Sequence, residues 1–138
     1  MFDGSMQSFP LTLDRILDHA AKWHPDVEVV TAREGGERAR IGYAGLHERA
    51  RRISSVLAGL NVKTGDRVAT LCTPSPDYFI CFLAATSVGA IWVGLNPRYQ
   101  LNELSYVVED SQPVLLLARS SIDGRDYTPE LSGLVQDH

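Results

Sequence analysis

The sequence predicts an α/β fold built on a parallel sheet of three strands. Three short apolar runs, at residues 67–72, 90–95 and 114–118, alternate with two longer segments of helical periodicity, 77–88 and 101–110. Apolar runs of four to eight residues that alternate with helices are typical of βαβ units. The runs are continuously apolar, as expected of strands that helices cover on both faces. We therefore expect right-handed crossovers through the two helices.

The residues before this core predict two helices and a hairpin. Residues 11–23 have the apolar spacing of an amphipathic helix, and Thr12 stands at its N-cap position. Strands at 27–33 and 37–41 flank a Gly-Gly pair, which is a hairpin signal. A longer helix follows over 46–60, with a basic opposite face that is most simply a solvated surface.

The two ends of the chain differ in composition from this middle part. We interpret residues 1–11 as a disordered or vector-derived leader, because they lack the basic and then apolar pattern of a signal peptide. Residues 119–138 are polar, with one weak apolar helix, and we interpret them as a tail cut short. One α/β domain over residues 12–118, with an N-terminal β-hairpin and flanking helices, is the expected organisation.

Charge and cysteine usage restrict the class of protein. The net charge of −4 argues against a general nucleic-acid binder, which is normally basic. Cys72 and Cys81 lie in predicted core elements, which favours buried free thiols in a reducing compartment and a cytoplasmic location. The uncharged stretch 78–96 is long enough to span a bilayer. Glycines and an Asn-Pro pair interrupt it, so we expect a buried helix followed by a buried strand and no transmembrane segment.

Patterns of common catalytic and cofactor sites are absent from the sequence. It contains neither a G-x-G-x-x-G after a strand nor a Gly-rich loop that ends in Gly-Lys-Ser/Thr. His19, His24 and His47 have no metal-ligand spacing, and Ser75 lies between prolines rather than in a nucleophile elbow. Asp77 opens a helix, where capping or dipole complementation is the ordinary role. The residues themselves thus predict no catalytic group and no metal site.

Several short sequence segments, taken together in their order and spacing, resemble those of the adenylate-forming enzymes. They are Ile41-Gly-Tyr-Ala-Gly-Leu46, Lys63-Thr-Gly-Asp-Arg-Val-Ala69, Leu95-Asn-Pro-Arg98, Asn102-Glu-Leu-Ser-Tyr106 and Glu109-Asp-Ser111. This family includes acyl- and aryl-CoA synthetases, luciferases and the adenylation domains of peptide synthetases. The Asn-Pro-Arg-Tyr form is similar to fatty-acyl and related CoA synthetases.

The resemblance implies an ATP-dependent acyl-CoA synthetase. In that family ATP activates a carboxylic acid as an acyl-adenylate with release of pyrophosphate, and the CoA thiol then displaces AMP; ATP, CoA and magnesium are the expected cofactors. The resemblance also places Arg98 where some CoA ligases bind the 3′-phosphate of CoA. Arg98 follows a buried strand and a Pro turn, so it is expected at the C-terminal edge of the sheet. An ion pair with Glu103, or a surface arginine with no partner, is the alternative.

The chain departs from the family in one respect. The family's phosphate-binding loop, its acidic ribose-binding residue, its hinge and its catalytic lysine have no counterpart in this sequence. The resemblance therefore implies an N-terminal piece of a synthetase, inactive alone, which binds ATP only weakly. Such a piece exposes apolar surface and open sheet edges, and we expect it to self-associate.

Two other interpretations remain open from the sequence. One is a piece of an aryl-CoA ligase or of another adenylating enzyme. The other is a stand-alone α/β binding or regulatory module. A phospho-receiver module would need an acidic cluster at the strand ends, whereas these read Cys72-Thr73-Pro74, Leu95-Asn96-Pro97 and Ala118-Arg119.

Overall fold

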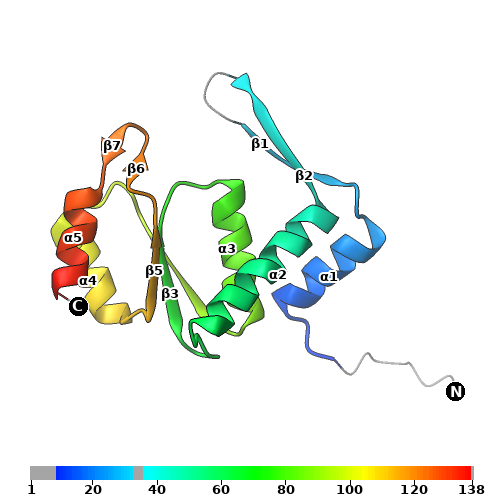
Figure 1. Cartoon of the computed structure of the whole chain (residues 1–138), viewed down its shortest axis with the longest axis horizontal. Coiled ribbons are helices and arrows are strands. Elements are labelled where there is room, and N and C mark those ends of the chain that lie inside the picture. The colour runs from blue at the N-terminus through cyan, green and yellow to red at the C-terminus, as the bar shows by residue number, and fades with distance from the viewer. Residues whose placement is uncertain (1–8, 33–35, 138) are drawn as a thin grey trace, which may run out of the picture.

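The computed structural model describes residues 9–32 and 36–137, and it has a three-layer core with a hairpin beside it (Figure 1). Residues 1–8, most of the predicted leader, and Gly35 of the predicted hairpin turn lie outside the described residues. The elements in chain order are α1 (Leu13–Trp23), β1 (Glu28–Ala32), β2 (Arg38–Gly42), α2 (Tyr43–Gly59), β3 (Arg67–Leu71), α3 (Pro76–Ser87), β4 (Ile91–Leu95), α4 (Leu101–Ser111), β5 (Leu115–Ala118), β6 (Ser121–Ile122), β7 (Arg125–Asp126) and α5 (Thr128–Asp137).

The central sheet consists of β3, β4 and β5, all parallel, in the order β4-β3-β5. The three predicted strands are confirmed to within one residue at their ends. Thr70 marks the register, since it lies opposite Gly94 on one side and Leu117 on the other. The connections through α3 and α4 run in opposite directions along the sheet and place their helices on opposite faces. The two crossovers therefore have the same hand, as the handedness rule for βαβ units requires.

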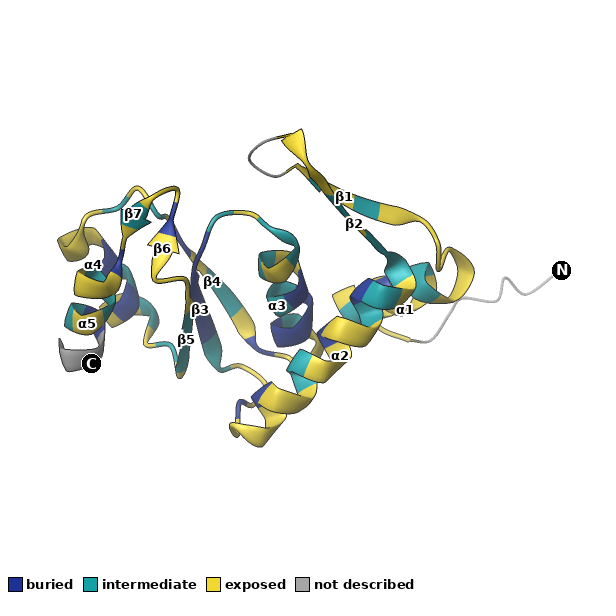
Figure 2. Cartoon of the chain, turned by 45° about the horizontal axis from the view of Figure 1, so that its top comes forward, coloured by how far each residue is buried: buried dark blue, intermediate teal, exposed yellow. Residues whose placement is uncertain are grey.

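Helices cover both faces of β3, which explains why Val68, Ala69 and Leu71 are apolar although they point to both faces of the strand. Ala69 and Leu71 pack with side chains of α4 and α5, among them Leu104 and Leu134. Val68 packs on the other face with Leu57 of α2 and Ala84 of α3. Figure 2 shows the buried residues concentrated on β3 and on the helix surfaces that face it. Among the described residues no helix is long and apolar enough to cross a membrane.

The N-terminal helix and hairpin pack beside this core through a third cluster. Leu17 of α1, Leu46 of α2 and Ile80 of α3 are buried together, with Val29 and Ile41 of the hairpin against them. The strands β1 and β2 pair antiparallel, as predicted. Thr12 does occupy the N-cap position of α1, but its side chain forms no capping hydrogen bond.

The segment after β5 is more ordered than the sequence indicated. The helix predicted there is α5, but the hairpin of β6 and β7 that precedes it was not predicted. Ile122, Tyr127 and Leu134 from this segment are buried in the same cluster as Leu71 and Leu104. Residues that the sequence analysis treated as a polar tail thus contribute three buried side chains to the core.

The helix α2 begins earlier than predicted, at Tyr43 instead of Leu46, and one residue of its predicted apolar stripe is exposed. Leu57 and Leu60 both belong to the predicted apolar stripe, yet Leu57 is 1 % exposed and Leu60 is 60 % exposed. The helix ends at Gly59, and Leu60 is its C-cap residue, so the helical periodicity no longer applies to Leu60.

This pair provides a matched test of the core. We expect Leu57→Ala to lower the free energy of unfolding by about 2–5 kcal/mol, because it removes a buried side chain and leaves a cavity. Leu60→Ala, the same change on an exposed side chain, should stay within about 0.5 kcal/mol of wild type. Urea unfolding followed by circular dichroism measures both, and equal losses in the two variants would contradict the assigned packing.

Candidate functional site

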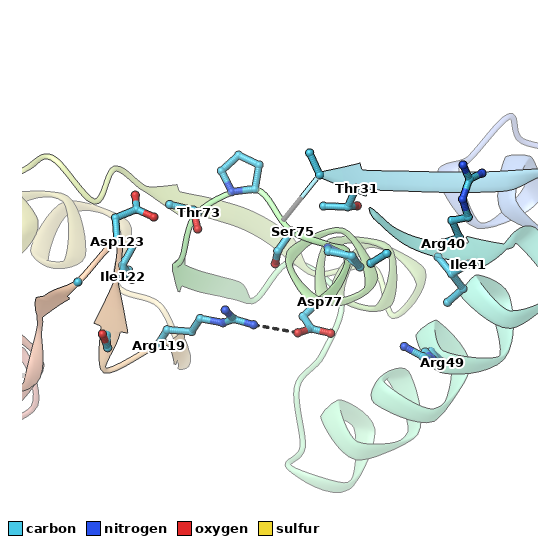
Figure 3. Close-up of a pocket in the computed structure, with 16 residues that line it drawn as sticks. Thr31, Arg40, Ile41, Arg49, Thr73, Ser75, Asp77, Arg119, Ile122 and Asp123 are labelled. Atoms are coloured by element: carbon cyan, nitrogen blue, oxygen red, sulfur yellow. Dashed lines mark hydrogen bonds and ion pairs between the residues drawn. The ribbon is translucent and has the colours of Figure 1, made fainter. Parts of the chain in front are cut away.

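The C-terminal edge of the parallel sheet is the candidate site. The three strands end there at Leu71, Leu95 and Ala118, and the loops that follow them carry polar side chains. In open α/β sheets ligands bind outside the C-terminal ends of the strands. An open cleft with a volume of about 770 Å³ lies at this edge, between the sheet and the β1–β2 hairpin (Figure 3).

The walls of the cleft come from parts of the chain that are distant in sequence. Thr73 and Ser75 belong to the loop between β3 and α3, and Arg119 to the segment after β5; Arg40 and Arg49 come from β2 and α2. This convergence explains why the sequence analysis did not identify the cleft. The basic face of α2 supplies one of its arginines, Arg49, while Arg52 of the same face pairs with Glu48 outside it.

The sequence analysis gave Asp77 either helix capping or dipole complementation as its role. In the structure Ser75 caps the helix, and Asp77 complements the dipole. Ser75 is the N-cap of α3, and its Oγ accepts a hydrogen bond from the backbone N–H of Tyr78 at 3.1 Å. Asp77 lies in the first turn, where its charge complements the helix dipole. Its Oδ2 also accepts a hydrogen bond from Arg119 at 3.0 Å, which joins two residues of the cleft lining (Figure 3). Ser75 is thus a structural residue here.

Arg98 lies at the same edge of the sheet but outside the cleft lining. Its side chain is exposed, and its backbone N–H donates to Asn96 Oδ1 at 3.0 Å. Glu103 is not its partner: that carboxylate accepts from the backbone N–H of Gln100 at 2.8 Å, in the capping box of α4. Among the described residues no ion pair involves Arg98. The guanidinium is therefore available to an anionic ligand.

Cys72, Cys81 and His47 have structural environments, whereas His19 and His24 are exposed. Cys72 is buried and Cys81 half-buried, and both are free thiols. Burial raises the pKa of the Cys81 thiol, and the nearby charges of Asp77 and Cys72 raise it further. His47 hydrogen-bonds to Asp18 at 2.9 Å, which joins α2 to α1. Within residues 9–32 and 36–137, no three side chains of His, Cys, Asp or Glu form a group that could hold a metal.

This fold is the α/β class in which a parallel sheet carries its ligand site at the C-terminal strand ends. Residues 17–137 match the family model described as AMP-binding enzyme. Because this match covers most of the chain, the protein belongs to the AMP-binding enzyme family. That assignment confirms the resemblance to adenylate-forming enzymes, and it does not support the stand-alone regulatory module.

Individual relatives agree with this assignment. The chain is 34 % identical over 135 residues to a long-chain-fatty-acid–CoA ligase of Thermus thermophilus, covering 98 % of this chain and 23 % of the relative. It is 29 % identical over 113 residues to a 3-methylmercaptopropionyl-CoA ligase of Ruegeria lacuscaerulensis, covering 82 % of this chain and 21 % of that protein. The chain thus spans less than a quarter of the length of these two relatives.

A solved structure agrees at the level of the fold as well. It is that of a putative long-chain-fatty-acid CoA ligase from Rhodopseudomonas palustris, with 27 % identity and a TM-score of 0.79. The alignment covers 95 % of this chain and 31 % of that structure. The α/β architecture, with its hairpin and three-stranded parallel sheet, is therefore one that such ligases share.

The environment of Cys81 leads to a testable expectation. Because its pKa is raised, we expect its alkylation by iodoacetamide to be slower at pH 8 in the folded chain than in urea, by several-fold. The rate in the folded chain should still be rising at a pH where that of the unfolded chain has levelled off. Mass spectrometry of the modified peptide measures the rate, and Cys81→Ser isolates the contribution of Cys72. Equal rates in the two states would contradict the assigned environment.

Proposed function

We propose that this chain is part of an ATP-dependent acyl-CoA synthetase that acts on a fatty acid. The family match carries the proposal, and the Asn96-Pro97-Arg98-Tyr99 turn supports the CoA-ligase branch. In the proposed reaction the carboxylate attacks the α-phosphorus of ATP, which forms an acyl-adenylate and releases pyrophosphate. The CoA thiol then loses its proton and attacks the acyl carbonyl carbon. The bond between that carbon and the phosphate oxygen of the adenylate breaks, and AMP is released. Magnesium balances the charge on the phosphates of ATP.

In this proposal the chain supplies a frame rather than the adenylation chemistry. Developing charge on a transferred phosphate needs closely placed N–H groups or cations. The sequence has no Gly-rich phosphate loop and no lysine after Lys63. We therefore place carboxylate activation and tight ATP binding outside these 138 residues. We also propose that the enzyme is cytoplasmic, which the two free thiols favour.

The surface of the chain favours self-association when the chain is isolated. β4 and β5 are both edge strands of the described sheet, and open edges pair readily with other chains. Ile91 at the start of β4 is 51 % exposed, and Phe79 of α3 is partly exposed as well. The sequence from residue 78 to residue 97, which contains Phe79 and Ile91, has no charged side chain.

Arg98 is the residue that we propose for CoA binding. It lies at the C-terminal edge of the sheet with an exposed side chain and no ionic partner among the described residues. A guanidinium binds phosphate in a bidentate manner, and the 3′-phosphate of CoA is the group of that ligand most suited to it. Because CoA reacts only in the second half-reaction, Arg98 would contribute to that half-reaction and not to adenylation.

The Arg98 proposal predicts a separation of the two half-reactions. In the full-length synthetase we expect Arg98→Ala to raise the KM for CoA about ten- to a hundredfold, the equivalent of one charge-assisted hydrogen bond. Adenylation, measured as carboxylate-dependent exchange of pyrophosphate into ATP, should remain near wild type. Arg52→Ala is the matched control, because Arg52 is an exposed arginine of α2 paired with Glu48. An unchanged KM for CoA, or a parallel loss of adenylation, would make Arg98 a structural residue.

The isolated chain provides a second test. We expect the purified 138-residue chain to show no carboxylate-dependent exchange of pyrophosphate into ATP and no tight ATP binding by calorimetry. The physical reason is the missing phosphate loop. Measurable exchange, abolished by heating the same preparation, would show that the chain holds an adenylating site of its own.

A further inference from the structure

We propose that Tyr127 is a positioning residue for Arg98. Its side chain holds the turn after β4 at the edge of the sheet, and so fixes the direction from which Arg98 meets its ligand. This inference rests on the proposed function only for the identity of that ligand. We call the hydrogen bond from the Tyr127 hydroxyl to the turn after β4 the clamp, and it lies entirely within the described residues.

The contact is made on the peptide group that precedes Arg98. Tyr127 is 3 % exposed, and its hydroxyl donates a hydrogen bond to the carbonyl oxygen of Pro97. That carbonyl belongs to the peptide bond between Pro97 and Arg98. A displacement of this peptide plane would therefore change the direction of the Arg98 side chain, whereas the bond between the hydroxyl and the carbonyl keeps the plane in place.

Tyr127 itself is held from several directions. Its backbone N–H donates to Ser120 at 2.7 Å, and its carbonyl accepts from Leu131 N–H at 2.9 Å. The Arg125 guanidinium lies over its ring at 4.5 Å from the centroid and pairs with Glu130 at 2.5 Å. This pairing raises the pKa of Arg125 and lowers that of Glu130, so both stay charged near neutral pH. The hydroxyl therefore projects from a fixed ring.

The other hydrogen bonds of the turn are local. Asn96 Oδ1 accepts from Arg98 N–H and the Asn96 carbonyl accepts from Tyr99 N–H, both at 3.0 Å. The capping box between Gln100 and Glu103 closes the start of α4. These contacts set the internal shape of the turn. In the described part of the chain, the Tyr127 bond is the one hydrogen bond that joins residues 97–100 to a segment outside residues 96–104.

The two roles, local shape and placement, separate in an experiment. Tyr127→Phe removes only the hydroxyl, so the core packing of the ring is kept. Tyr78→Phe is the matched control, because the Tyr78 hydroxyl accepts from Trp92 Nε1 at 3.1 Å and lies on α3, against the opposite face of the sheet. Arg125→Ala is a second variant that keeps the hydroxyl but removes the cation over the ring.

Hydrogen exchange of the 138-residue chain tests the clamp without any ligand. We expect Tyr127→Phe to speed exchange of the Arg98 and Tyr99 amides about three- to tenfold, the range for one lost hydrogen bond. Arg125→Ala should have a smaller effect in the same direction, and Tyr78→Phe none. Unchanged exchange at both amides in Tyr127→Phe overturns the clamp, whatever the role of Arg98.

Kinetics of the full-length synthetase test the consequence for the ligand. We expect Tyr127→Phe to raise the KM for CoA about three- to tenfold, less than Arg98→Ala because the arginine remains, with kcat and adenylation unchanged. Faster exchange with no rise in KM, while Arg98→Ala does raise it, overturns the positioning role. If neither variant raises the KM for CoA, the exchange result still supports the clamp, and the proposed role of Arg98 in CoA binding fails.

Discussion

The burial of β3 on both faces is the constraint on which the rest of the structure depends. Its side chains from Val68 to Leu71 are almost completely inaccessible to solvent, so each face needs its own helical layer. Parallel neighbours cannot be joined by a tight turn and need a longer crossover connection, which here contains a helix in both cases. These two requirements place α3 and α4 on opposite faces. They also bring the loops after all three strands to one edge, where the cleft and Arg98 lie.

The elements predicted correctly from the sequence are those with a strong local signal. The three core strands are continuous apolar runs, and α1, α3 and α4 show clear helical spacing, so their positions depend little on the rest of the chain. The β6–β7 hairpin could not be predicted, because strands of two residues show no periodicity. Leu60 follows the stripe of α2 in sequence but lies beyond the end of the helix.

The same distinction applies to the candidate site. Arg98 was placed at the sheet edge because a strand followed by a Pro turn fixes where the chain emerges, and no long-range information was needed. The hydrogen bond from Tyr127 to Pro97 joins residues 30 positions apart, and neither residue type indicates its partner. The cleft between the hairpin and the sheet has the same origin, since α2, β2 and the segment after β5 meet only in three dimensions.

The strand order has a consequence for how the protein is made. β3 is the first strand of the sheet to leave the ribosome, yet it occupies the centre of the finished sheet. It has no partner until β4 has been synthesised, and its other side stays open until Ala118 has emerged. During that interval the strand that is most buried in the finished sheet is accessible to chaperones and to other chains. Misassembly competes with folding under this condition. The early cluster of α1, α2 and the β1–β2 hairpin is complete before then, except for its contacts to α3, and gives the growing chain a partial surface on which to fold.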